Sequence, residues 1–198
     1  ILLSTLAGNA SAWRIECKRL RTLQLSTWSP RNVVLRGYLM SAVLLALAWA
    51  VGGIAGALFF AACGLAGKAL LEVVNYMEHY GMLRQLVGPP QKQRFERVQP
   101  SHSWNSNNIA TNVLLYHLQR HSDHHANPTR RYQTLRSVAG APNLPSGYAS
   151  MVALTYFPPL WRKVMDHRVL DHYDGDITRV NIDPRRREKI LAGYRTQP

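Results

Sequence analysis

A long run of apolar residues dominates the first half of the chain. Residues 37–67 contain no Asp, Glu, Lys, Arg or His. As one straight helix this run would be roughly 46 Å long, whereas the hydrocarbon core of a bilayer is ~30 Å thick. Gly52 and Gly53 lie near its centre, and a glycine pair favours a break in a helix. The pattern predicts a transmembrane helical hairpin with spans at about 33–51 and 54–83.

Basic residues lie on both sides of the apolar run and support the hairpin. A hairpin keeps both basic clusters in the cytoplasm, whereas a single span would place one of them on the outer side. The clusters consist of Arg14, Lys18, Arg19, Arg21, Arg31 and Arg36 before the run, and Arg84, Lys92, Arg94 and Arg97 after it. We therefore expect residues 31–83 to form the hairpin, with both ends of the chain cytoplasmic. One long helix, tilted or buried, is the alternative interpretation.

The segments on either side of the hairpin are polar, and their periodicity favours helices. Residues 11–25 predict an amphipathic helix that can lie on a membrane surface, so residues 1–30 are expected to form an interfacial or cytoplasmic segment. Residues 84–198 are expected to form a cytoplasmic region without a strong strand pattern. Its expected helices cover residues 105–126, 158–170 and 183–191, with a loop at 139–147. The expected fold class is all-α.

Composition restricts the class of protein further. The chain of 198 residues carries 24 Lys and Arg against 11 Asp and Glu. The apolar run and the aromatic residues exclude a disordered chain, and a count of two cysteines argues against a disulfide-stapled secreted domain. The hairpin is rich in Ala and Gly, which favours packing against further transmembrane helices. Because this sequence offers none, and because it opens with Ile, we expect a C-terminal piece of a larger protein.

Four histidines cluster in the third region. They would share one face of the predicted helix 105–126, at offsets of four, seven and eight residues. They are His117, His121, His124 and His125. Crowded cationic imidazoles repel one another, whereas neutral imidazoles that bind a metal do not. The spacing predicts a metal site, with zinc, iron and copper left open, and a solvated polar face is the alternative.

The second predicted span carries a polar stripe near its end. The stripe consists of Glu72, Asn75, His79 and Met82. Its members follow one another at helical spacing on an apolar helix, and Glu78 lies beside them. Ionisable residues at membrane depth are unfavourable and usually mark function. We expect the stripe to face a site, and a turn at the level of the lipid headgroups is the alternative.

Several segments resemble signatures of a known family. Residues 75–81, Asn-Tyr-Met-Glu-His-Tyr-Gly, resemble the N-Y-x-E-H-Y-G motif of the membrane-bound alkane monooxygenases. Residues 118–126, Leu-Gln-Arg-His-Ser-Asp-His-His-Ala, resemble that family's third histidine box. His-Ser-Trp-Asn-Ser at 102–106 and Leu-Pro-Ser-Gly-Tyr at 144–148 are also similar to family sequence. The resemblance extends over nearly the whole chain, from about residue 11 to residue 168.

The resemblance implies a diiron centre. In this family, histidines supply almost all ligands to two non-haem irons at the cytoplasmic ends of a six-helix bundle. By position, the implied ligands are His79, His121, His124 and His125. The family has two further histidine boxes upstream, and no histidine precedes His79 in this sequence. We therefore expect this chain alone not to assemble the diiron centre or to turn over substrate.

Other polar residues are implied around these ligands. Two carboxylates, Glu78 and Asp123, are the catalytic candidates and are expected to orient imidazole N–H groups. A local salt bridge to Arg84 or Arg120 is the alternative for either carboxylate. Three candidates for positions beside the ligands are Asn75, His102 and His117.

The resemblance also implies an activity for the intact enzyme. The family hydroxylates the terminal methyl of medium-chain n-alkanes with dioxygen, in the bacterial inner membrane, and takes electrons from rubredoxin. The formal net charge of +13 favours an acidic partner such as rubredoxin. Candidates for docking it are Arg185, Arg186 and Arg187. Contact between these arginines and anionic lipid is the alternative.

Three other interpretations stay open at this point. Another histidine-box membrane iron enzyme, such as a fatty acyl desaturase or an aromatic side-chain hydroxylase, would use the same chemistry. A basic membrane-surface module that binds lipid or nucleic acid would explain the charge and leave the histidines unused, and we expect no nucleic-acid partner. A structural zinc site is disfavoured because the cluster lacks Cys ligands.

Overall fold

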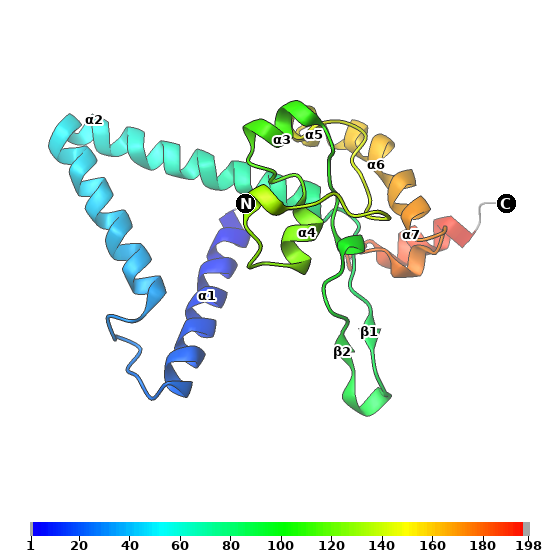
Figure 1. The fold of residues 1–198 in the computed structure, drawn as a ribbon, viewed down its shortest axis with the longest axis horizontal. Helices are drawn as coiled ribbons and strands as arrows, with labels where there is room; N and C mark the ends of the chain where they lie inside the picture. Colours follow the sequence, from blue (N-terminus) through cyan, green and yellow to red (C-terminus); the bar gives the residue numbers. More distant parts are fainter. Residues whose placement is uncertain (1, 196–198) are drawn as a thin grey trace. The chain divides into compact units, whose positions relative to one another are not determined.

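The computed structural model describes residues 2–195, and the side chains of residues 7–194. It contains two compact units, which divide between Glu72 and Val73. Most of the described chain is helical (Figure 1). The α-helices are α1 (Leu2–Thr22), α2 (Val33–Glu78), α3 (Ile109–Leu114), α4 (His121–Ala126), α5 (Tyr148–Thr155), α6 (Pro158–His172) and α7 (Arg187–Arg195). The strands are β1 (Leu86–Val87) and β2 (Arg94–Phe95), and the 3-10 helices are η1 (Pro90–Lys92), η2 (Pro100–His102), η3 (Tyr132–Thr134) and η4 (Ile177–Arg179).

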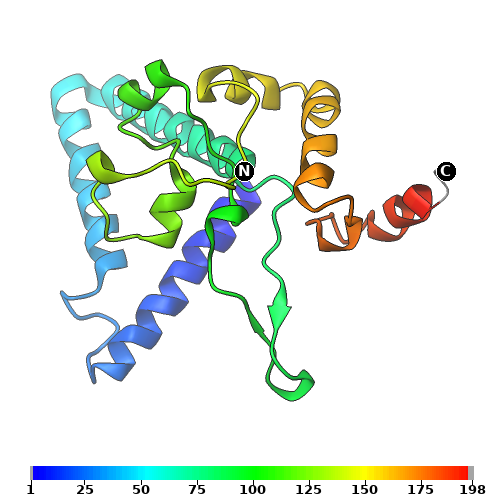
Figure 2. The same cartoon turned by 45° about the vertical axis from the view of Figure 1, so that its right-hand side comes forward.

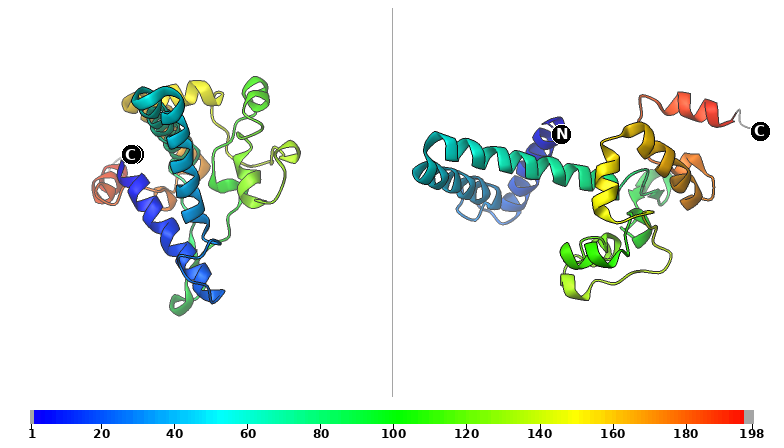
Figure 3. Two further views of the ribbon diagram at one scale, coloured as in Figure 1. Left: turned by 90° about the vertical axis from the view of Figure 1, so that its left-hand side faces the viewer. Right: turned by 90° about the horizontal axis from the view of Figure 1, so that it is seen from above.

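α2 consists of two helical arms that meet at Gly53. The backbone there has φ 60° and ψ −153°, a conformation outside the helical region that glycine adopts far more readily than other residues. The second arm folds back from the first at this point (Figures 1 and 3). A Cβ atom on Gly56 would lie 2.5 Å from the carbonyl oxygen of Ala48, so the two arms touch close to the bend. The predicted break at the glycine pair is confirmed.

Length and composition make α2 a candidate membrane segment. Its 46 residues include a stretch that is long and apolar enough to cross a bilayer. Large apolar side chains such as Leu39 and Phe59 are exposed on it, as expected for a surface that meets lipid or other helices. The second arm ends at Glu78 and not at residue 83 as predicted, because the chain turns away through Gly81, whose φ is 74°.

The link between α1 and α2 holds the first unit together. α1 begins and ends earlier than the predicted helix 11–25, and Gln24, just beyond its end, takes a left-handed φ of 56°. The side chain of Asn32 then caps α2, because its Oδ1 accepts the N–H groups of Val34 at 2.9 Å and Leu35 at 3.1 Å. Backbone donors that have no partner within the helix are satisfied in this way.

The second unit is built around an apolar core. α6 contributes a buried stripe at a spacing of four residues, Trp161, Met165 and Val169. α5 adds the fully buried ring of Tyr148 to the same cluster. The predicted helix 158–170 is confirmed and extends slightly further, whereas α5 was not predicted, because its eight residues are too few to show a clear helical period.

The prediction of a mainly helical chain is confirmed, and two short strands add a β-ribbon to this unit. β1 and β2 pair antiparallel, with Leu86 opposite Phe95 and Val87 opposite Arg94. Gly88 begins the turn between them with a φ of 109°. Figure 2 shows this ribbon projecting away from the helices of the second unit. Strands of two residues are too short to show an alternating pattern in the sequence.

The predicted helix 105–126 is wrong, because this segment forms two short helices, α3 and α4. Between them, Tyr116 and His117 take left-handed φ angles of 51° and 59°, which interrupt the helical geometry. The N–H of His117 donates to the carbonyl of Asn112 at 2.8 Å and closes the turn. The histidine box therefore starts a new helix at His121.

The last predicted helix is also displaced along the chain. α7 begins at Arg187 and not at residue 183, because Asp183 closes a turn before the helix. Its Oδ1 accepts the N–H of Arg185 at 3.0 Å, and its carbonyl accepts the N–H of Arg186 at 2.9 Å. An Asp–Pro pair suits a helix cap and a tight turn equally well, so the sequence did not distinguish the two.

Candidate metal centre

The end of α2 is fixed by the segment that follows η2. The backbone N–H of Trp104 donates to the carbonyl of Glu78 at 2.8 Å, and its indole N–H donates to the carbonyl of Tyr80 at 2.9 Å. Both carbonyls therefore have partners without a continuing helix. His79 is consequently the first residue beyond α2, held between two anchored neighbours.

The start of α4 is held by the same segment. The buried side chain of Asn105 accepts the N–H of Ser122 at 2.9 Å and donates to its Oγ at 2.5 Å. The Asn105 backbone also exchanges hydrogen bonds with Pro142 and Leu144, at 2.9 and 2.8 Å. A buried amide with all these partners specifies a single geometry. The segment at 102–106 thus links the end of α2 to the histidine box.

Three imidazoles converge at this junction. The Nε2 atom of His121 lies 2.7 Å from Nε2 of His125 and 3.4 Å from Nε2 of His79. Ligand nitrogens of all three lie within 4.8 Å of one another, a spacing at which one metal ion can be held. His121 and His125 are four residues apart on α4, so they share one face of the helix. The structure therefore brings together three of the four predicted ligands.

His124, the fourth predicted ligand, lies outside this group of three. Its ring centroid is 6.3 Å from that of His121 and 5.9 Å from that of His125, and its side chain is exposed. Its place in the sequence turns it to another side of α4. His124 therefore lies beside the cluster but does not point to the place where the other three imidazoles converge.

The protonation state of the cluster suits a metal. Nδ1 of His79 lies 3.4 Å from the carbonyl oxygen of His102. Because a carbonyl oxygen only accepts, this contact places the proton of His79 on Nδ1 and leaves Nε2 free. Burial, aided by the neighbouring imidazoles, lowers the pKa of His121 to about 3, and burial also lowers the pKa of His125. Neutral imidazoles are the form that binds metal.

Glu78, one of the two expected carboxylates, lies at the cluster and contacts the same nitrogen of His121 that faces His79 and His125. Its Oε2 is 3.2 Å from Nε2 of His121, and its Oε1 accepts a hydrogen bond from the hydroxyl of Tyr148 at 2.8 Å. Both Glu78 and Tyr148 are buried. Tyr148 closes the Leu-Pro-Ser-Gly-Tyr segment, but nothing in the sequence pattern marks it as part of a site.

Asp123 occupies a different position from the one expected. Arg130 donates to both of its carboxylate oxygens at 2.6 Å, and the backbone N–H of Arg136 donates to Oδ2 at 2.8 Å. Burial alone raises the pKa of this carboxyl, but these hydrogen bonds outweigh burial and the net pKa is lowered. Among the described residues, no imidazole contacts the carboxylate. Asp123 therefore ties the loop after α4 to that helix, and the cation involved is neither Arg84 nor Arg120.

The three residues expected beside the ligands have separate roles. Asn75 is exposed on α2, and its backbone carbonyl accepts the N–H of His79 at 3.2 Å. His102 acts through its carbonyl, while its ring lies beside Glu96 with Nε2 3.2 Å from Oε1. His117 stands outside the cluster, and its Nδ1 is buried without a hydrogen-bond partner among the described residues.

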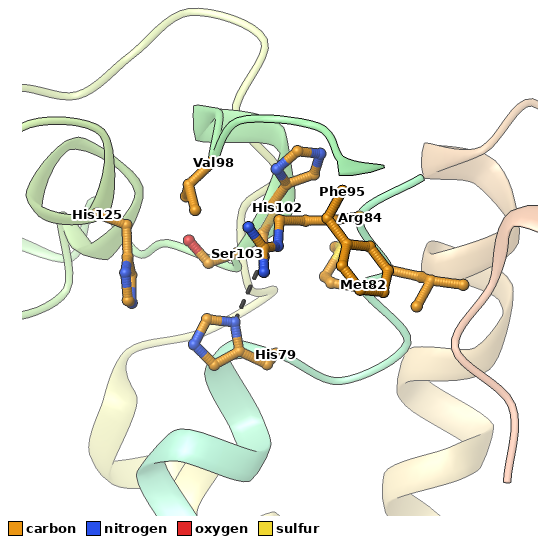
Figure 4. Close-up of a pocket in the computed structure, with 9 residues that line it drawn as sticks. His79, Met82, Arg84, Phe95, Val98, His102, Ser103 and His125 are labelled. Carbon is orange, nitrogen blue, oxygen red and sulfur yellow. Dashed lines mark hydrogen bonds between the residues drawn. The ribbon is translucent and has the colours of Figure 1, made fainter. Parts of the chain in front are cut away.

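An open pocket of about 430 Å³ lies against the cluster. Figure 4 shows His79 at the end of α2 and His125 on α4, with His102 between the cluster and the β-ribbon. Apolar side chains complete the lining, among them Met82 and Phe95. His79 and His125 therefore border open space on this side, whereas His121 is buried behind them.

Comparison with known proteins identifies the family. The model of the fatty acid desaturase family matches residues 2–155, which is most of the chain. The chain belongs to the fatty acid desaturase family. The resemblance to alkane monooxygenases that the motifs predicted is confirmed by curated relatives of that name.

Three relatives illustrate the similarity of this desaturase-family chain. Alkane 1-monooxygenase of Acinetobacter baylyi is 48% identical over 184 residues, which cover 93% of this chain and 44% of the relative. Alkane 1-monooxygenase 2 of Pseudomonas aeruginosa is 48% identical over 167 residues, which cover 84% and 43%. The xylene/toluene monooxygenase hydroxylase component XylM of Pseudomonas putida is 30% identical over 164 residues, which cover 81% and 41%. The chain spans less than half the length of these relatives.

Membership of this family implies iron, and the donor set of this desaturase-family chain fits it. Neutral imidazole is a good ligand for iron, and the cluster offers three such nitrogens with a carboxylate at hydrogen-bond distance from one of them. Both cysteines, Cys17 and Cys63, are free and belong to the first unit. His79, His121 and His125 are the side chains placed to hold an iron ion.

Proposed function

We propose that the chain is part of a membrane alkane 1-monooxygenase that hydroxylates the terminal methyl of medium-chain n-alkanes with dioxygen. The observation that carries the proposal is the convergence of His79, His121 and His125, in a chain 39–48% identical to seven curated alkane 1-monooxygenases. Aromatic side-chain hydroxylation is less well supported, because identity to the xylene/toluene enzyme is 30%.

The side chains of this cluster have distinct tasks in the proposal. Iron supplies the redox chemistry that an unactivated C–H bond requires, which acid–base groups alone do not provide. One iron would be held by His79, His121 and His125. The second iron of the pair would take His124 as a ligand. Glu78 places a buried carboxyl group beside His121. The remaining ligands come from the part of the enzyme that this chain does not span.

The two arms of α2 carry the proposed membrane topology. Each arm crosses the bilayer once, so the bend at Gly53 lies on the outer side and the cluster after Glu78 lies at the cytoplasmic surface of the bacterial inner membrane. Linear alkanes dissolve in the hydrocarbon core. The exposed apolar side chains of α2 then meet lipid or the other helices of a six-helix bundle, and substrate reaches the iron from the membrane.

Electrons are proposed to come from rubredoxin, which docks on the basic C-terminal part of the chain. Arg185 and Arg186 are exposed, and Arg187 is half-buried with its guanidinium 3.4 Å from the carbonyl of Thr178. An acidic partner fits this charge. Reversing the charge of all three arginines should slow electron transfer and weaken its salt dependence. Unchanged electron transfer, with weaker binding to anionic vesicles, assigns the arginines to lipid.

Product analysis on the full-length protein in membranes tests the proposal. With rubredoxin, its reductase and NADH, octane should give 1-octanol, while a fatty acyl substrate and p-xylene should give far less product. His121→Ala should abolish turnover and lower the iron content. His167→Ala is the matched control, because His167 is an exposed histidine on α6 outside the cluster. Dominant oxidation of p-xylene or of the fatty acyl chain overturns the proposed substrate class.

A further inference from the structure

A buried tyrosine from α5 reaches the candidate metal centre through one hydrogen bond. The ring of Tyr148 is 1% exposed and packs in the core of the second unit. Its hydroxyl donates to Oε1 of Glu78 at 2.8 Å, and the other oxygen of Glu78 lies 3.2 Å from Nε2 of His121. Three elements that are distant in sequence, α5, α2 and α4, are joined by these two contacts.

We infer that Tyr148 is a positioning residue of the metal centre, which acts by holding the Glu78 carboxylate against His121. One hydroxyl occupies one oxygen of the carboxylate, so the other oxygen is the one that faces the imidazoles. The inference deepens the proposed iron site and rests on it.

The hydroxyl of Tyr148 acts as a hydrogen-bond donor and does not only fill space in the core. A buried tyrosine O–H needs a hydrogen-bond partner, and the hydroxyl of Tyr148 donates to the Glu78 carboxylate. Burial, together with the negative charge of Glu78, raises the pKa of Tyr148, so its hydroxyl stays protonated and donates. A carboxylate bound on one oxygen has a fixed orientation, and residues that fix the groups around metal ligands typically change metal affinity about 10–100-fold when they are lost.

Close packing between the start of α5 and the start of α3 places Tyr148 within reach of Glu78. Gly147 precedes Tyr148, and a Cβ at this glycine would lie 3.1 Å from Cγ of Asn108 and 3.2 Å from Oγ1 of Thr111. The glycine lets the start of α5 pass close to the start of α3. Ser106 adds a tie on the same side, because its Oγ donates to the carbonyl of Ser146 at 3.3 Å. The Leu-Pro-Ser-Gly-Tyr segment thus positions the hydroxyl of Tyr148 next to Glu78.

The experiment compares Tyr148→Phe with Tyr173→Phe in the full-length protein. Both substitutions remove one buried hydroxyl and keep the ring, but Tyr173 bonds to the backbone of Leu83 and does not contact the cluster. Three quantities are measured: the iron retained against a chelator, the ligand-field spectrum of the Co²⁺-substituted protein, and the melting temperature. Tyr148→Phe should weaken metal retention about 10-fold and alter the spectrum. Tyr173→Phe should lower the melting temperature only.

A double-mutant cycle shows whether Tyr148 acts through Glu78. Glu78→Met removes both carboxylate oxygens and keeps a similar volume. In that background Tyr148→Phe should change neither metal retention nor the spectrum further, because interacting residues are non-additive. Equal effects of Tyr148→Phe with and without Glu78 overturn the inference, as does an unchanged spectrum in the single variant. If the unaltered protein holds iron but does not oxidise alkanes, the proposed substrate fails while the inference about Tyr148 stands.

Discussion

The backbone carbonyl of His102 lies 3.4 Å from Nδ1 of His79 and determines which nitrogen of that imidazole is free. The ring of His102 is itself held on both sides. Its Nδ1 accepts the N–H of Gln99 at 3.0 Å, so its Nε2 carries the proton and donates to Glu96 at 3.2 Å. Glu96 in turn accepts the N–H of Gln85 at 2.7 Å across the base of the β-ribbon. The orientation of His79 therefore depends on a chain of contacts that begins in the ribbon.

Glu96→Ala should loosen this chain and weaken the metal centre. Loss of the carboxylate frees the ring of His102, so the carbonyl that orients His79 becomes mobile. We expect metal retention to fall by about 10-fold, as for other groups that orient a ligand. Competition with a chelator measures it, and Glu188→Ala, in an exposed residue of α7, is the control. Equal metal retention in the two variants would show that the ribbon does not support the site.

Gly81→Ala should destabilise the second unit more than an ordinary glycine substitution. Gly81 has a φ of 74°, and a Cβ there would lie 2.5 Å from Cγ1 of Val169 in the core. Gly140→Ala is a matched control, because Gly140 has a φ of 79° and nothing within 4 Å of its Cβ position. Strain alone should lower the free energy of unfolding by about 1 kcal/mol at Gly140, and overpacking should add roughly 1–3 kcal/mol at Gly81.

Thermal melting of both glycine variants separates strain from overpacking. Because Gly81 lies two residues beyond His79, Gly81→Ala should also reduce metal retention, whereas Gly140→Ala should leave it unchanged. Equal melting temperatures for the two variants would mean that Val169 moves aside without a penalty.

Gly56→Ala should open the bend of α2. The added Cβ would lie 2.5 Å from the carbonyl oxygen of Ala48, and a backbone atom cannot move aside as a flexible side chain can. We expect a loss of roughly 1–3 kcal/mol in stability, against a small gain for Gly64→Ala, whose Cβ would meet nothing within 4 Å. Cross-linking of cysteine pairs across the two arms measures the change, and equal yields in both variants contradict the close approach.

Acid should break the hydrogen bond that Glu16 accepts from the start of α2, because it protonates the Glu16 carboxylate. Hydrogen bonds from Arg19 at 2.7 Å and from the N–H of Val33 at 2.9 Å lower the pKa of this carboxyl from 4.5 to about 2. A lowered pKa means that the stabilisation is present above pH 4.5 and is lost as pH falls through about 2. The protection factor of the Val33 amide, its exchange rate relative to the intrinsic rate at each pH, should fall over this interval. In Glu16→Gln the protection factor of the Val33 amide should be low and independent of pH, and a protection factor that still falls with acid in this variant would point to another group.

The pattern of the sequence determined the long helix, its break and the type of chemistry. A run without charges needs an apolar surrounding wherever it lies, and the glycines in it favour a bend at Gly53. Local composition was therefore sufficient to predict both the membrane segment and its break. The two histidine motifs likewise indicate the kind of ligand and the family without any tertiary contact. His121 and His125 share a helical face because of their spacing alone.

Only the tertiary structure decided which side chains meet. The left-handed turn at His117 depends on a hydrogen bond to Asn112, and this turn removes His117 from the face predicted for it. His79 reaches His121 because Trp104 and Asn105 tie the end of α2 to the start of α4, and helical periodicity does not encode contacts between elements. The roles of Asp123 and Tyr148 were decided in the same way, since each depends on a partner from a distant segment.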